Sequence, residues 1–432
     1  MHDLLIRNGR VIDPASGRDE TCDVAVAKGR IARVGRIRSK ARETIDADER
    51  IVCPGLIDIH VHCREPGNEE KESIATAAGA AVAGGFTTIC AMPNTQPPAD
   101  DERAIQYVLH RAARADLSRV LPAGCITKGR QGHDLSEMGQ MLQAGAVAFT
   151  DDGDGVASAS VMQRALQYAH MLGAPVMQHC QDQDLAGGVM NSGAVAVRLG
   201  LPGIAGSGEQ IMLRRDIELV ERTSARYHVH HVSTAGSVEL IRQAKAAGVP
   251  ITAEATPHHL LLTDAACMNY ESNFKMNPPL RSREDVEALR AAVADGTIDC
   301  LATDHAPHSA EEKELEFALA PFGIISLECA LGLYVKALVD TKRMDWPELV
   351  RRMTVGPSEV IRHQMPGLGT LEVGAPADIT VIDPKRRWTV RTDAFVSRSR
   401  NCPYEGWRLK GKATTTIVGG KIKFMENHES GR

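Results

Sequence analysis

Short apolar runs alternate with helical periodicity through the middle of the chain. Each run is of strand length and is followed by a segment in which apolar residues recur with the period of a helix. Strands that alternate with helices indicate βα units and a parallel sheet. The eight candidate strands are 56–62, 86–92, 120–126, 146–150, 175–179, 227–232, 250–255 and 298–303. Eight such units predict an α/β fold, a TIM-type (β/α)8 barrel.

Helical segments fall between most of these runs. Residues 102–115 (ERAIQYVLHRAARA) are predicted as one helix and residues 237–248 (SVELIRQAKAAG) as another. In the second segment Val238, Ile241 and Ala244 share one face, which is typical of a helix that packs against a sheet. The glycine that closes this segment can end the helix.

The two ends of the chain carry short β-type runs broken by turn signals, such as Lys28-Gly29 near the start and Gly419-Gly420 near the finish. Neither end has enough strands for an independently stable sheet, so we expect the two ends to pair into one small β-sandwich domain. The predicted organisation is residues 1–54 and 367–432 in this small domain, with residues 55–366 forming the barrel.

Composition and charge narrow the class of protein. Hydrophobic residues make up 43% of the 432 residues and charged residues 24%, an ordinary globular balance. The formal net charge of -5 and the scattered Lys and Arg residues argue against nucleic acid or an anionic membrane as the partner. No apolar stretch has the length of a membrane span or signal peptide, so we expect a cytoplasmic protein with a small-molecule substrate. The ten scattered cysteines indicate reduced, mostly buried thiols.

Histidine and aspartate residues gather where a barrel keeps its functional groups, at the carboxyl ends of the strands and in the loops that follow. Residues in such positions are His60, His62, Asp151, Asp152, His179, His230, His231 and Asp304. Strand residues i and i+2 project to the same side, so His60 and His62 can bind one ion. Imidazole and carboxylate ligands predict a metal centre, with zinc as the default and one or two ions.

Two choices within this set stay open on local pattern. Asp151 and Asp152 are adjacent acids; either can be the ligand while the other accepts loop hydrogen bonds, and Asp152 is the candidate for a bridging ligand. Strand alternation should send one of His230 and His231 toward the barrel interior and the other toward the helices, but spacing does not say which. Alternation also turns Cys63 away from the neighbouring histidines, so we interpret it as a core thiol.

Five motifs together resemble those of dihydroorotase, a family of the amidohydrolase superfamily, in the subgroup typical of many bacteria. The motifs are HVHCREPG at 60–67, MPNT at 92–95, FTDDG at 149–153, MNPPL at 276–280 and TDHAPH at 303–308. The resemblance runs the whole length and includes the split β-domain. Its closing segment GTLEVGAPAD, which ends at Asp378, is widespread among amidohydrolases and says less.

The resemblance implies a ligand set and settles both open choices. The implied metal ligands are His60, His62, Asp152, His179, His231 and Asp304. Many amidohydrolases bridge two ions with a carbamylated lysine on the fourth strand, but residues 146–155 contain no lysine, and Lys128 and Lys275 lie elsewhere. The chain therefore resembles the subgroup that uses an aspartate bridge.

The resemblance also implies a reaction, the reversible cyclisation of N-carbamoyl-L-aspartate to L-dihydroorotate in pyrimidine (UMP) biosynthesis. Asp304 would act as general acid and base toward metal-activated water. The substrate keeps a free carboxylate, for which Arg64 offers a bidentate guanidinium. The other implied substrate contacts are His62, Asn94, Asn277, His308, Phe322 and Gly323.

Two histidines and one loop lie near these motifs. His258 and His259 are interpreted as structural or supporting residues. Residues 305–323 contain no clear strand and are predicted to form a loop over the barrel mouth that can exclude water. The charge run in this loop is interpreted as a solvated face.

Two alternatives compete with this assignment. A hydantoinase or allantoinase would open a cyclic ureide on the same scaffold, but its substrate gives Arg64 no carboxylate to bind. A non-catalytic scaffold for aspartate transcarbamoylase would be expected to lack metal-ligating residues, which this chain has. Association with that enzyme in addition to catalysis, or with further copies of the same chain, stays open.

Overall fold

A computed structural model describes residues 1–361 and 364–426 and contains a closed parallel barrel. Its eight strands are hydrogen-bonded in chain order, and a parallel bridge from Val61 to His305 joins the first strand to the segment after the last. The predicted (β/α)8 barrel is confirmed. The barrel strands are β6 (Leu56–Val61), β7 (Phe86–Ala91), β8 (Arg119–Gly124), β9 (Ala148–Phe149), β10 (Val176–Gln178), β13 (Tyr227–Val229), β14 (Ile251–Ala255) and β15 (Cys300–Leu301).

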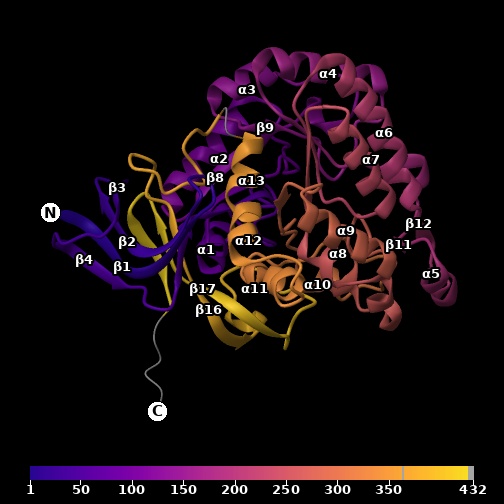
Figure 1. Cartoon of the computed structure of the whole chain (residues 1–432). Helices are drawn as coiled ribbons and strands as arrows, with labels where there is room; N and C mark the ends of the chain where they lie inside the picture. Colours follow the sequence, from indigo (N-terminus) through magenta and orange to yellow (C-terminus); the bar gives the residue numbers. More distant parts are fainter. Residues whose placement is uncertain (362–363, 427–432) are drawn as a thin grey trace.

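Helices surround this barrel in the right-hand part of Figure 1. Helix α2 covers the predicted residues 102–115, whereas α7 begins at Ala235, two residues early, because the Thr234 side chain caps it by accepting from Ser237 N. The larger helices are α1 (Ile74–Gly84), α2 (Glu102–Ala115), α3 (Met138–Ala144), α4 (Ala159–Leu172), α6 (Gly206–Thr223), α7 (Ala235–Ala246), α9 (Arg283–Asp295), α12 (Trp346–Met353) and α13 (Val355–Ile361). Shorter elements are α5 (Ala194–Leu199), α8 (Pro257–Leu261), α10 (Ala310–Lys313), α11 (Ala330–Tyr334), β11 (Met190–Asn191) and β12 (Gly203–Ile204).

A second sheet combines strands from both ends of the chain. Figure 1 shows the indigo N-terminal strands beside the yellow C-terminal ones, and the strand order is β18-β17-β16-β5-β1-β2-β3, with β4 paired to β1. This confirms the predicted small β-domain, although the two halves form one continuous sheet, joined where β5 pairs with β16. Its strands are β1 (His2–Asp13), β2 (Arg18–Ala27), β3 (Arg30–Gly35), β4 (Ala41–Asp46), β5 (Ile51–Pro54), β16 (Ile379–Thr389), β17 (Arg408–Val418) and β18 (Lys421–Met425).

The segment between β16 and β17 leaves this sheet and returns to the barrel mouth. There Ser399 donates to the Lys71 carbonyl, and Asn401 donates to the carbonyls of Ala306 and Gly323. Residues of the predicted range 367–432 thus serve the barrel as well as the sheet. The domain boundaries stay a prediction, and residues 362–363 and 427–432 of the predicted ranges lie outside the described residues.

Two further expectations can be compared with the fold. All ten cysteines are buried and free, as the reduced-thiol interpretation predicts, and Cys63 lies in the main hydrophobic core. Among the described residues, we find no helix with the length and apolar character needed to cross a bilayer.

Candidate active site

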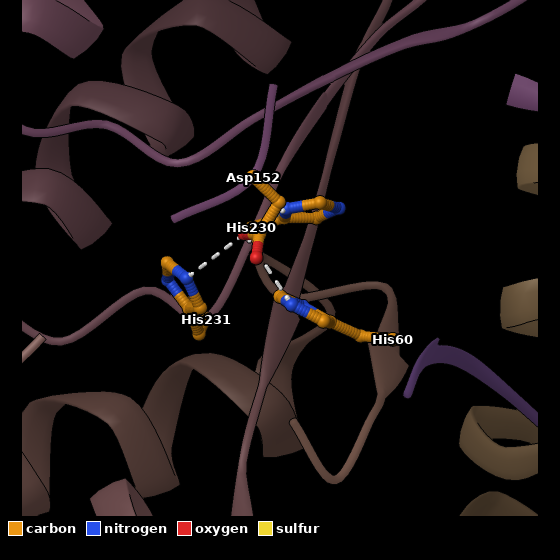
Figure 2. A group of neighbouring side chains, drawn as sticks. All are labelled: His60, Asp152, His230 and His231. Atoms are coloured by element: carbon orange, nitrogen blue, oxygen red, sulfur yellow. Dashed lines mark hydrogen bonds and ion pairs between the residues drawn. The ribbon is translucent and has the colours of Figure 1, made fainter. Parts of the chain in front are cut away.

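Asp152 lies among imidazoles at the carboxyl end of the barrel strands. It follows β9, while His60 lies on β6 and His230 and His231 come directly after β13 (Figure 2). Oδ1 of Asp152 is 3.1 Å from Nδ1 of His230, 3.4 Å from Nε2 of His60 and 3.7 Å from Nε2 of His231. All four side chains are buried. Their converging atoms could hold a metal ion.

A second group of possible ligands adjoins the first and shares His60. Oδ1 of Asp304 is 3.5 Å from Nε2 of His60 and 2.9 Å from Nε2 of His62. Nε2 of His62 is also 3.5 Å from Oδ2 of Asp152, so the two groups are contiguous. Two adjoining groups are compatible with the one or two ions predicted from the sequence.

His179, which follows β10, joins this cluster beside His231. Its Nδ1 lies 2.9 Å from Nε2 of His231 and 3.8 Å from Oδ1 of Asp152. Its Nε2 lies 3.2 Å from Oε1 of Gln181 and 3.4 Å from Nδ2 of Asn277. The structure thus brings together all six residues for which metal ligation is predicted, and their role as ligands stays a prediction.

The surroundings of His62 suit a bound cation. Its Nδ1 is 2.9 Å from Oδ1 of Asn94 and its Nε2 is 2.9 Å from Oδ1 of Asp304, so both ring nitrogens face oxygen atoms. Burial lowers the pKa of His62, and a neutral imidazole carries only one N–H. A cation between Nε2 and Asp304 would replace the missing proton.

The spacing of the cluster also suits zinc. The buried Nε2 atoms of His60 and His230 have no hydrogen-bond partner among the described residues. Four ligands at about 2.0–2.1 Å from a tetrahedral Zn²⁺ lie about 3.3–3.4 Å from one another. The distances of 3.4 Å and 3.5 Å from Nε2 of His60 to Asp152 and Asp304 are close to this spacing. The residues present therefore fit the predicted metal.

Charges in the cluster oppose the effect of burial on the pKa values of Asp152, Asp304 and His60. Burial alone would raise the pKa of Asp152 and Asp304, but nearby imidazoles, His60 foremost, hold both below their ordinary range. Burial lowers the pKa of His179 to about 3 and that of His230 to about 4. Burial would lower the pKa of His60 too, yet the surrounding carboxylates raise it. Ionised carboxylates and neutral imidazoles are the ligand forms, and at His60 the cluster favours a positive charge.

The two adjacent acids have different surroundings. The carboxylate of Asp151 accepts hydrogen bonds from Ile126 N at 2.8 Å, Thr127 N at 3.1 Å and the Thr127 hydroxyl. Asp151 thus anchors the loop after β8, while Asp152 faces the imidazoles. This geometry agrees with the choice that the resemblance implies.

His230 and His231 do not alternate as expected from strand geometry. Both rings lie close to Asp152, whereas alternation predicted that one would face the helices. The expectation was wrong because His231 has φ 27°, which breaks the strand at this point. Arg64 and Asp304 also have positive φ, at 59° and 47°. Such conformations are costly for residues other than glycine and concentrate at functional sites.

A cavity of about 340 Å³ opens above the cluster and receives most of the predicted substrate contacts. Ten predicted site residues line it, from several strand ends and from the segment after β15. The predicted site residues that line it are His62, Arg64, Asn94, Asp152, His179, His231, Asn277, Asp304, His308 and Phe322. His60 and Gly323 are not among the lining residues.

Arg64 lies at one side of this cavity beside His308. Its Nε donates to the Pro307 carbonyl at 3.1 Å, and its Nη2 is 3.4 Å from Nε2 of His308. Nδ1 of His308 is 3.2 Å from a carboxylate oxygen of Glu312. The amide oxygen of Asn94 lies against His62, which leaves its NH2 group available as a donor. Arg64 supplies the positive charge at this side of the cavity, because burial and the nearby guanidinium lower the pKa of His308 to about 3.

The backbone of Gly323 is hydrogen-bonded within the protein, and its contact with the substrate stays a prediction. Its N–H donates to the Lys275 carbonyl at 2.9 Å, so this N–H is already used within the protein. A Cβ at Gly323 would lie 2.6 Å from both the Ala306 carbonyl and Cδ2 of His308. Gly323 therefore lets the loop pack closely against His308, while Phe322 faces the cavity.

The charge run in this loop is only partly solvated. Glu311, Glu314 and Glu316 are exposed, but Lys313 is buried and donates to the carbonyls of Pro321 at 3.0 Å and Gly323 at 3.2 Å. The solvated-face interpretation is wrong for Lys313, because its ammonium group is hydrogen-bonded to the later part of the same loop.

The two lysines considered for carbamylation lie away from the cluster. Lys128 forms an exposed ion pair with Glu137 at 3.2 Å. Lys275 donates to the Ala318 carbonyl at 3.0 Å, and its Nζ lies 4.7 Å from the centre of the Phe322 ring.

Glu254 on β14 is a site residue that the sequence analysis missed. It is fully buried; its Oε1 is 2.5 Å from Nδ1 of His60 and its Oε2 is 3.1 Å from Nε2 of His228. A carboxylate behind a histidine fixes the tautomer and directs the other nitrogen at a metal. The available signal was an acid inside a strand with no other charged residue. His259 is structural, since it bonds Thr256 and the Pro278 carbonyl.

Comparison with known proteins places the chain in a family. A family model described as Dihydro-orotase-like matches residues 49–237. The dihydroorotase of Syntrophotalea carbinolica is 50% identical, over 98% of this chain and 99% of that protein. This chain belongs to the dihydroorotase family. Another dihydroorotase, from Anaeromyxobacter dehalogenans, is 50% identical over 98% of both chains.

Solved structures show the same fold with lower identity. An L-hydantoinase from Arthrobacter aurescens superimposes with a TM-score of 0.89 at 26% identity, over 99% of this chain and 97% of that one. A D-hydantoinase from Thermus sp. gives 0.82 at 25% identity, over 99% and 97%. The much higher identity to dihydroorotases over the full length distinguishes the family within this shared fold.

Proposed function

We propose that this chain is a zinc-dependent cyclic amidohydrolase that interconverts N-carbamoyl-L-aspartate and L-dihydroorotate. One observation carries the proposal beyond family membership. The cavity is lined both by Arg64 and by residues of the His and Asp cluster, so it can hold a carboxylate and a reacting amide at once. Both forms of this substrate have a free carboxylate.

The cluster residues would hold one or two zinc ions. When bound, zinc activates water for attack and polarises the amide carbonyl. The proposed ligands are His60, His62, Asp152, His179, His231 and Asp304. Glu254 keeps the Nδ1 proton of His60 engaged, so that Nε2 faces the centre of the cluster.

Asp304 is the proposed general acid and base. Its carboxylate is buried at the cavity wall and is held ionised by nearby imidazoles, so it can accept a proton from the attacking water. It then passes this proton to the leaving ring nitrogen. In the cyclising direction the same oxygen takes the proton of the ureido nitrogen.

The substrate carboxylate would lie against Arg64, with Asn94 and His308 beside it. Nη1 of Arg64 and the NH2 group of Asn94 are the donors that contacts with the described residues leave for it. Asn277 and Phe322 also line the cavity and are placed to contact the ring. Fixing both ends of the substrate aligns its reacting atoms.

A hydantoinase activity is the second candidate, because solved hydantoinases share the fold. Ring opening of dihydroorotate and of a hydantoin, followed in the ultraviolet, separates the two. The metal-loaded wild type should open dihydroorotate and leave the hydantoin intact, and Asp304→Asn should open neither. Asp299→Asn, at the opposite end of β15 where Asp299 pairs with Lys245, is the matched control and should retain activity.

Turnover of the hydantoin without turnover of dihydroorotate would overturn the proposal. A wild type that opens neither ring would favour the scaffold alternative. The proposed setting is the cytoplasm. Assembly with further copies of this chain or with an aspartate transcarbamoylase extends the proposal, and gel filtration of the chain alone and with that enzyme tests it.

A further inference from the structure

Asn401 comes from the segment between β16 and β17, far in sequence from the predicted site residues. The residue is 3% exposed, and its side chain makes three hydrogen bonds to backbone atoms. The amide NH2 donates to the Ala306 carbonyl at 3.0 Å and to the Gly323 carbonyl at 3.1 Å, and the amide oxygen accepts from His308 N at 3.1 Å. Its own carbonyl accepts from Ile325 N at 3.1 Å.

These contacts join the two segments that form one side of the cavity. One segment carries His308, and the other carries Phe322 and Gly323. The segments touch closely, since a Cβ at Gly323 would lie 2.6 Å from Cδ2 of His308. Asn401 is bonded to both, so it sets the distance between them.

Other contacts at this side of the cavity depend on the same distance. The Gly323 carbonyl that accepts from Asn401 also accepts from Nζ of Lys313 at 3.2 Å. His308 in turn lies 3.4 Å from Nη2 of Arg64. A shift of the His308 backbone would therefore change the position of its ring relative to the guanidinium.

We propose that Asn401 is a positioning residue for the substrate carboxylate, holding His308 and the Phe322-Gly323 backbone in register with Arg64. The inference rests on the proposed function and adds to it a residue outside the barrel that acts through others. An amide is the side chain suited to this place, because it supplies two donors to carbonyls and one acceptor to an N–H. A carboxylate would turn an acceptor toward both carbonyls.

Asn401→Ala and Asn401→Asp test this role. Either variant should raise the KM for dihydroorotate by between about 10- and 100-fold, since small misplacements of binding groups have effects of this size. The kcat at saturation and the bound metal should change little, because no cluster residue is moved. Asn401→Asp keeps the acceptor for His308 N–H and serves as the second variant if Asn401→Ala folds poorly.

Asn191→Ala is the matched control. Asn191 is also a buried asparagine with both ends of its amide bonded, to Asp264 at 2.9 Å and Arg281 at 3.0 Å, but it does not line the cavity. It should lower stability without raising KM. The proposal is overturned if the Asn401 variants have the KM of this control, or if they lose kcat and metal together with KM. A wild type that opens no dihydroorotate would instead refute the proposed function.

Discussion

The guanidinium of Arg64 has donors that the protein itself uses and donors that it leaves free. Its Nε is bonded to the Pro307 carbonyl, and its Nη2 faces His308. Arg64→Met should therefore raise the KM for dihydroorotate by at least about 100-fold, because a buried charge-assisted pair is lost. Bound zinc, measured by atomic absorption, should stay at the wild-type level. Loss of the metal in this variant would show that Arg64 has a structural role instead.

Glu254 supports His60 without contacting the cavity. Glu254→Gln should weaken zinc binding by about 10- to 100-fold, the usual effect of removing a carboxylate behind a ligating histidine. Competition with a chelator measures this affinity. The half-buried Glu328, which accepts from Val396 N and Ser397 N, provides the control Glu328→Gln. Equal zinc affinity in the two variants would show that Glu254 does not support zinc binding.

Residues that act directly could be predicted from the sequence, and residues that act through others could not. His60, His62 and Arg64 stand in one short motif whose spacing already points them the same way. Glu254 and Asn401 reach the site only through contacts with segments distant in sequence, such as the 194 residues that separate Glu254 from His60. No local pattern encodes such a contact.

At the scale of elements, all eight barrel strands were predicted, but several are shorter than expected. The run 227–232 yields β13 at Tyr227–Val229, and the run 175–179 yields β10 at Val176–Gln178. The missing residues include His179 and His231, which line the cavity. At His231 the backbone leaves the strand conformation, so apolar periodicity alone overestimates the strand at the end that carries the site.

The loop of residues 305–323 should respond to pH through Lys313. Burial, with a smaller contribution from Lys275, lowers the pKa of Lys313 to about 7 from an ordinary value of 10.5, and Glu312 opposes this. Between these two pH values the folded chain has released a proton that the unfolded chain keeps, so stability rises with pH. The unfolding free energy of the wild type minus that of Lys313→Met should increase from pH 7 to pH 10.

Urea unfolding at several pH values measures this difference. Lys410→Met changes an exposed lysine and should show no such trend, because that side chain contacts water in both states. A flat difference for Lys313→Met over this range would mean that its ammonium stays charged in the loop.

At the scale of the whole molecule, Asp378 connects the barrel to the second sheet. Its carboxylate accepts from Arg119 of β8 at 2.8 Å and 3.3 Å and from Gly419 N at 2.7 Å. Asp378→Ala should lower the unfolding free energy by about 2–3 kcal/mol, the range for hydrogen bonds to a charged group whose partners are left behind. Thermal and urea unfolding measure this loss, and kcat/KM at low temperature should be unchanged. A variant as stable as the wild type would show that the sheet needs no such connection.

The second sheet cannot be completed until the C-terminal strands have been synthesised. Strand β5 pairs with β16, and Thr380 follows its neighbour Cys53 by 327 residues. At about 5–20 residues per second, translation leaves this edge of the N-terminal strands uncovered for on the order of tens of seconds. During that interval the nascent chain exposes an unpaired strand edge that can pair with other chains. We therefore expect the nascent chain to need chaperones until the last strands have been synthesised.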